Sequence, residues 1–171
     1  MTGGEVFADT VVVVRCTQKL LCRLRDWAWV EAESTTVLGD WCGNLVVTRN
    51  VRLLLFISER YRLPVLLPAR NLAGLATNFP TAVSNVLVRL SVPALSISRE
   101  LEAMAEVRFV PTNSRSLLAS LNDFTFHLKW RLQTETGVDL QSLALELSEV
   151  PSGPLGYQQP GEVTRGLFVG A

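Results

Sequence analysis

Residues 107–128, VRFVPTNSRSLLASLNDFTFHL, decide the fold, because they predict a strand, a tight polar turn and a long helix in that order. Val107 and Phe109 are residue types that favour strands, and Pro111 ends strand pairing since it has no N–H to donate. Apolar residues then recur at spacings of four, three and four, which indicates one helical face turned toward a core. They are Leu117, Leu121, Phe124 and Leu128.

The polar turn of this stretch is a candidate anion site. Thr112, Asn113 or Ser114 can cap the helix, and the helix start offers free backbone N–H groups beside the guanidinium of Arg115. Free N–H groups and the helix dipole favour a bound anion at such a position. The simpler interpretation is a helix cap with Arg115 in solvent, since every helix needs a start and few starts bind a ligand.

A second strand–helix junction occurs near the N-terminus. Residues 11–15 form a continuous apolar run typical of a strand buried on both faces, and Thr17 can cap a helix whose inner face ends at Trp27. Arg15 and Lys19 place two cations at this junction. The two junctions make one site only if they meet at the same edge of the sheet, with Arg15 and Arg115 as neighbours.

The segment LGDWCGNL at residues 38–45 predicts a turn or short helix capped by Asp40 and anchored by Trp41. Gly39 or Gly43 would take a positive φ there. Asp40 and Asn44 would share one face of a helical turn, but one carboxylate and one amide are too few ligands for calcium or magnesium.

Other patterns complete a layered α/β or α+β fold in which helices pack on a mixed sheet of about five strands. The further predicted elements are strands at 52–58 and 63–68, a helix at 71–90, a short helix from Ser96 or Ser98, a strand at 140–150 and a short helix at 161–168. Pro64 and Pro68 make the 63–68 strand an edge strand or a short one. Pro80 should kink or split the 71–90 helix.

Composition favours one globular domain over residues 1–171, with a loose leader at 1–10 and a covering tail at 151–171 that carries Tyr157. Sixteen basic and sixteen acidic residues cancel, so no strongly basic DNA-binding surface is indicated. No signal peptide or membrane-spanning run is evident, and we expect a cytoplasmic protein without a cofactor.

The cysteines and the one histidine do not predict a metal or redox site. Three cysteines without a C-x-x-C pair suit neither a disulfide framework nor zinc. Cys16 lies between two cations at a helix start, yet no base is placed beside it, so we expect a buried, inert thiol. His127 falls late in the long helix and is expected to be half-exposed.

Several motifs resemble a family of small bacterial proteins known only as a domain of unknown function. They are RCTQKLL at 15–21, LGDWCGNL at 38–45, TNSRSLLASLNDF at 112–124 and PSGPLGYQQP at 151–160. The likeness spans nearly the whole chain, with departures at Cys42, where an aromatic residue is expected, and at Ala119, where glycine is expected. The resemblance implies candidate positions and no mechanism.

The candidate site residues come from the two junctions and the motifs. They are Arg15, Thr17, Lys19, Asp40, Trp41, Asn44, Thr112, Asn113, Arg115, Asn122 and Asp123. The hypothesis they favour is a non-catalytic binding or interaction module for an anion, which could be phosphate, a nucleotide or nucleic acid. The alternatives are a hydrolase-like enzyme using Asp40 or Asp123 with Arg115, and a protein–protein partner subunit.

Overall fold

A five-stranded mixed sheet forms the centre of the molecule, as the sequence predicts. The computed structural model describes residues 10–29, 32–112 and 114–170. The strands are β1 (Val11–Cys16), β2 (Trp41–Val47), β3 (Arg52–Ser58), β4 (Pro64–Pro68) and β5 (Glu106–Pro111), in the order β4-β3-β2-β1-β5. β1 runs parallel to both β2 and β5, whereas β3 is antiparallel to β2 and β4.

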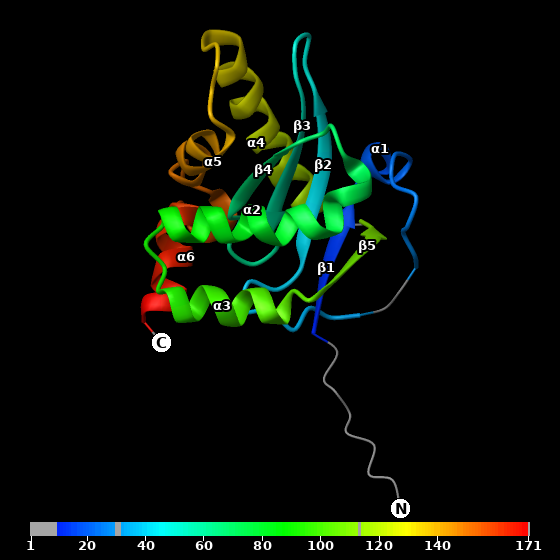
Figure 1. The fold of residues 1–171 in the computed structure, drawn as a ribbon. Helices are drawn as coiled ribbons and strands as arrows, with labels where there is room; N and C mark the ends of the chain where they lie inside the picture. The colour runs from blue at the N-terminus through cyan, green and yellow to red at the C-terminus, as the bar shows by residue number, and fades with distance from the viewer. Residues whose placement is uncertain (1–9, 30–31, 113, 171) are drawn as a thin grey trace, which may run out of the picture.

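Helices cover both faces of this sheet. They are α1 (Gln18–Leu21), α2 (Leu75–Arg89), α3 (Ala94–Ala103), α4 (Arg115–Thr134), α5 (Leu140–Ser148) and α6 (Pro160–Val169), with short 3-10 turns η1 (Leu72–Gly74) and η2 (Gly153–Leu155). Figure 1 shows α2 and α3 in front of the sheet and α4 behind it. The strand–helix alternation therefore produces three layers.

The α2 side of the sheet holds the aromatic core. The ring of Phe79 packs edge-on against Trp41 at 5.3 Å between centroids and lies 4.9 Å from Phe56. Gly43 makes this packing possible, since a Cβ there would lie 2.5 Å from the ring of Phe56. Gly39 is the glycine of this segment with a positive φ, at +75°.

The opening stretch folds as predicted. β5 leads through the polar turn into α4, whose predicted apolar stripe is buried at Leu117, Leu121, Phe124 and Leu128. The Ser114 hydroxyl caps this helix by accepting from the Leu117 N–H at 3.3 Å.

β4 is the edge strand that its prolines predict. The Ser58 N–H donates to the Leu63 carbonyl, so alternation turns the backbone groups of Pro64, Leu66 and Pro68 away from β3. Two of these three residues have no N–H, which makes the free edge a poor partner for another strand.

The predicted type of secondary structure was wrong for two elements. Residues 140–148 form helix α5 instead of a strand, with Leu143, Ala144 and Leu147 buried at helical spacing. The predicted capped turn at 38–45 is mostly strand β2, because its backbone pairs with β1 and β3 on both sides.

Helices α1, α2 and α3 differ from their predictions. α1 ends at Leu21, and Trp27, which was expected on its inner face, is 40% exposed. α2 passes through Pro80 without splitting, and α3 begins at Ala94, directly after Pro93, instead of at Ser96 or Ser98.

Candidate functional site

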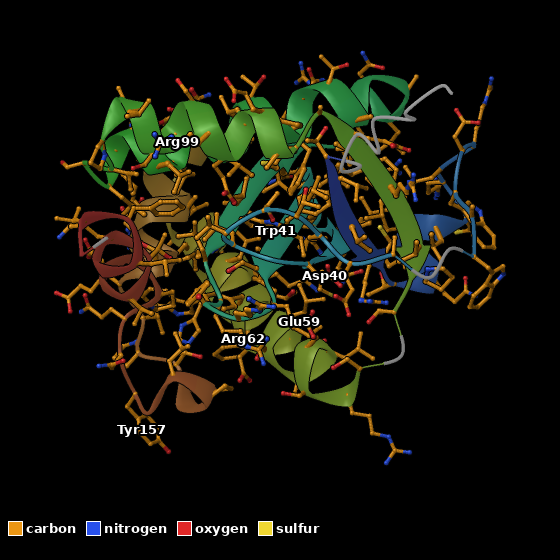
Figure 2. All side chains as sticks on the ribbon, turned by 90° about the horizontal axis from the view of Figure 1, so that it is seen from below. Asp40, Trp41, Glu59, Arg62, Arg99 and Tyr157 are labelled. Carbon is orange, nitrogen blue, oxygen red and sulfur yellow. The ribbon has the colours of Figure 1, made fainter. Side chains whose placement is uncertain are left out.

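Polar side chains gather between the start of α4 and the neighbouring ends of β1, β2 and β3. We call this group the α4-start cluster. Its members are Arg15, Asp40, Cys42, Glu59, Arg62, Thr112 and Ser116, and the exposed Arg115 precedes Ser116 on the first turn of α4. Strand register explains the gathering, because Arg15 lies opposite Cys42 on β2 and Cys16 lies opposite Pro111 on β5. Figure 2 shows Asp40, Glu59 and Arg62 beside the first turns of α4.

Arg15 and Asp40 form an ion pair at one side of the cluster. A guanidinium Nη2 of Arg15 lies 2.9 Å from Oδ2 of Asp40, whose side chain is only 12% exposed. The other Asp40 oxygen accepts from the Ser34 hydroxyl at 2.6 Å and from the Ser34 N–H at 3.1 Å. Both carboxylate oxygens of Asp40 are therefore occupied, and the Arg15 charge is compensated.

Arg62 is a buried arginine at the other side of the cluster. It is 6% exposed and holds a left-handed φ of +55°, which is uncommon for a residue with a side chain. Nη1 donates to the Glu59 carbonyl and Nη2 donates to the Ser116 hydroxyl at 3.2 Å, but Nε is buried without a hydrogen-bond partner. Burial lowers the pKa of Arg62 and the nearby Glu59 opposes this, yet a guanidinium remains charged in proteins.

Sequence reasoning missed Arg62 and Ser116. The 59–62 segment has the pattern of an ordinary hairpin turn, and no local signal predicts that its last residue turns inward with a positive φ. The partner of Arg62 lies on α4, far along the chain, and is known only once both elements are placed.

Cys42 lies between the two arginines as a protonated thiol. Burial raises its pKa to about 11, and a side-chain hydrogen bond with Thr112 partly opposes that rise. Burial likewise raises the pKa of Cys16, as expected for an inert thiol. Neither buried cysteine is a nucleophile at neutral pH, because the thiolate is the reactive form.

The first turn of α4 closes the cluster. Ser114 occupies the Leu117 N–H, and the Leu118 N–H donates to the Ser114 carbonyl, which leaves the N–H groups of Arg115 and Ser116 without intrahelical partners. The side chain of Arg115 is exposed and has no hydrogen bond or ion pair to any described residue. Asn113, the remaining predicted residue of this turn, lies outside the described residues.

In the two strand–helix junctions, the strand ends are neighbours, but the helices that follow them pack on opposite faces of the sheet. The Thr112 N–H donates to the Cys16 carbonyl at 3.1 Å, so both strand ends are side by side. α1 then packs on the α2 face, where Leu20 approaches Gly43, whereas α4 lies on the opposite face. Lys19, which is exposed on α1, is consequently apart from the α4 start.

Four other predicted residues lie outside the cluster. The Thr17 hydroxyl donates to the Asn44 amide oxygen at 2.6 Å, so these two satisfy each other at the end of β1. Trp41 is fully buried in the core on the α2 face. Asn122 is exposed on α4.

Asp123 is also exposed on α4 and lines a hollow of about 180 Å³ with Ser120 and His127. His127 is exposed as well. Asp123 follows Arg115 by eight positions, or about 12 Å along the helix axis.

The described residues hold neither a metal-ligand group nor a membrane-spanning helix. Within 10–29, 32–112 and 114–170, His, Cys, Asp and Glu side chains form no group of three that could hold a metal ion. No helix of the described chain combines the length and apolarity needed to cross a bilayer.

The sequence matches the model of a family described as Domain of unknown function (DUF6933) over residues 13–163. The chain belongs to this family. The resemblance inferred from its motifs is thereby confirmed, and the described α4-start cluster lies inside the matched part of the DUF6933 chain. No curated protein and no solved structure matches it.

Proposed function

We propose that this chain is a non-catalytic binding module that holds a phosphate-bearing anion at the start of α4. The observation that carries the proposal is the buried guanidinium of Arg62, whose Nε has no partner while its Nη2 contacts the first turn of that helix. A buried, unsatisfied donor is costly, and an anion that accepts from it would remove that cost.

The local charge supports an anion. The charges of Arg15 and Asp40 compensate each other, and the charge of Glu59 offsets that of Arg62. The guanidinium of Arg115 and the N-terminus of α4 are then the positive groups left without a compensating negative charge. The N-terminus of a long helix acts as a partial positive charge of about +0.5 and presents N–H groups to a ligand. Arg115 adds a guanidinium suited to a phosphate.

The hydrolase-like alternative receives less support from the same contacts. Asp40 already accepts three hydrogen bonds, and Asp123 lies about two helical turns beyond Arg115. Neither carboxylate is placed to take a proton from a ligand held at the α4 start.

Inorganic phosphate is the probe that tests the proposal. We expect titration to shift the backbone amide resonances of Arg115 and Ser116, with an affinity that falls as salt is raised. Arg115→Ala should weaken binding without changing the free energy of unfolding, because this side chain is exposed and unpaired. Arg99→Ala, which removes an exposed arginine on α3 (Figure 2), is the matched control and should bind as the natural chain does.

Two results would contradict this function. One is an equal response to phosphate in Arg115→Ala and Arg99→Ala. The other is a large loss of stability in Arg115→Ala with unchanged phosphate binding, which would make Arg115 a structural residue.

A further inference from the structure

Residues 23–29, RLRDWAW, form a second cationic surface that the α4-start cluster does not use. Arginine and tryptophan occupy alternate positions, at Arg23, Arg25, Trp27 and Trp29. The segment follows α1 and passes the outer edge of β5, where the Ala28 N–H donates to the Phe109 carbonyl at 3.2 Å. Figure 1 shows this loop beside β5, on the side of the molecule away from α3 and α6.

A pocket of about 450 Å³ lies between this loop and the start of α2. Arg23, Arg25 and Arg70 line it, and Asp26 is the one acidic residue in its lining, which leaves a surplus of two positive charges. The side chains of the three arginines form no ion pair or hydrogen bond with a described residue. Pockets of about 300–1,000 Å³ hold small molecules of nucleotide size.

Part of the lining of this pocket is apolar. The buried residues Leu24 and Phe109 line it together with Ala76 of α2. A planar group that entered between the cations would therefore meet apolar surface, which is the usual construction of a ligand site.

Two tryptophans extend the surface beyond the pocket. Trp27 is 40% exposed and Trp29 is 79% exposed, with ring centroids 6.1 Å apart in an edge-on arrangement. A shallow hollow beside Trp27 shares Asp26 and Phe109 with the arginine pocket, so the two depressions are neighbours. Exposed aromatic rings next to cations have open faces on which bases can stack.

The geometry points to a binding site for single-stranded nucleic acid, with backbone phosphates against Arg23, Arg25 and Arg70 and bases stacked on Trp27 and Trp29. Stacking needs unpaired bases with free faces, which a single strand offers and a duplex does not. Two depressions in series suit consecutive nucleotides better than one nucleotide. The site is independent of the proposed phosphate site, because the pocket lies on the α2 side of the sheet and α4 on the other.

Fluorescence anisotropy with a labelled single-stranded oligothymidylate tests this site in the full chain. Trp29→Ala should weaken binding by about 5- to 150-fold, the usual effect of losing one stacked base. Arg23→Ala and Arg25→Ala should each reduce the slope of log K against log salt by about 0.7. Arg99→Ala and Trp130→Ala, which remove an exposed arginine on α3 and a 56% exposed tryptophan on α4, should leave both quantities unchanged.

Four outcomes would overturn the proposal. They are binding unaffected by Trp29→Ala, equal affinity for duplex DNA, equal affinity for thymidine monophosphate, and losses in the control variants as large as in the loop variants. Since all substituted side chains are exposed, unchanged circular dichroism and melting temperature verify that each variant is folded. Arg115→Ala should not alter oligonucleotide binding, so failure of this site is distinguishable from failure of the phosphate site.

Discussion

At the scale of single residues, Glu100 places a carboxylate in the interior, where it holds a loop. Its side chain is 2% exposed, and its two oxygens accept the N–H groups of Val37 and Leu38 at 2.9 and 3.0 Å. Burial raises the pKa of Glu100 above the ordinary 4.5, and the two hydrogen bonds only partly oppose this. The folded state therefore binds this proton more tightly than the unfolded state does.

The raised pKa sets the sign of a pH effect. The contribution of Glu100 to stability should be fully present below about pH 4.5 and should decrease as the pH rises through its folded pKa. The free energy of unfolding of the natural chain minus that of Glu100→Gln should therefore fall from acid to neutral pH. Urea unfolding across this range measures the difference, with the exposed Glu102→Gln as control. A difference that grows with pH would contradict the expectation.

Gly43 gives a second prediction at this scale. Its missing Cβ leaves room for the Phe56 ring, which would otherwise lie 2.5 Å away. Gly43→Ala should lower the free energy of unfolding by about 1–3 kcal/mol, because the core must shift. Gly166→Ala in α6 is the control: no atom lies within 4 Å of its added Cβ, so it should stabilise the helix by about 0.5–1 kcal/mol. Equal effects in chemical denaturation would show that close packing at Gly43 is unimportant.

At the scale of elements, the cap of α4 can be separated from the anion site. Ser114→Ala removes the acceptor for the Leu117 N–H and should lower the free energy of unfolding by about 0.5–2 kcal/mol. Ser98→Ala on the exposed face of α3 is the control, and should be neutral or stabilising because alanine is the better helix former. Thermal or urea unfolding provides the measurement, and a neutral Ser114→Ala would mean that the cap contributes nothing.

Local signals explain which elements could be predicted. β1, β5 and α4 have long apolar patterns, and α4 also has a clear cap. All three form at the predicted positions. The strand predicted at residues 140–150 was wrong. Leu143, Leu145 and Leu147 alternate as in a strand, but a short apolar run of this kind also fits a helix. Asp139 caps α5 by accepting from the Ser142 N–H at 3.0 Å, and this cap was the available signal.

Long-range contacts explain what could not be predicted. β2 is a strand because β1 and β3 pair with it on both sides, which overrides the turn-like glycines of residues 39–43. In the candidate site, the meeting of the two strand ends follows from a parallel sheet, whereas the contact of Arg62 with Ser116 depends on the placement of α4. Neither junction carries a sequence signal that α1 and α4 pack on opposite faces of the sheet.

At the scale of the whole molecule, both edges of the sheet offer few free backbone donors to another strand. The loop at Ala28 donates one hydrogen bond to Phe109 of β5, while Pro64 and Pro68 leave β4 with few outward N–H groups. We therefore expect no partner chain to add a strand, because strand addition requires a row of free backbone donors and acceptors. We therefore expect recognition to use side-chain surfaces, such as the sites proposed at the α4-start cluster and at residues 23–29.

The C-terminal helix should unfold together with the sheet. α6 buries Phe168, and Arg165 donates from Nε to the Leu90 carbonyl at 2.8 Å, which ties the chain end to the end of α2. Phe168→Ala should lower the free energy of unfolding by about 3–5 kcal/mol, whereas Val169→Ala, at a 57% exposed position, should have little effect. Trp41, buried in the sheet, reports on the core in a Trp27→Phe, Trp29→Phe, Trp130→Phe background. If Phe168→Ala lowers the unfolding midpoint equally by Trp41 fluorescence and by far-ultraviolet circular dichroism, α6 and the sheet are one cooperative unit. An unchanged midpoint by Trp41 fluorescence would show that α6 unfolds separately.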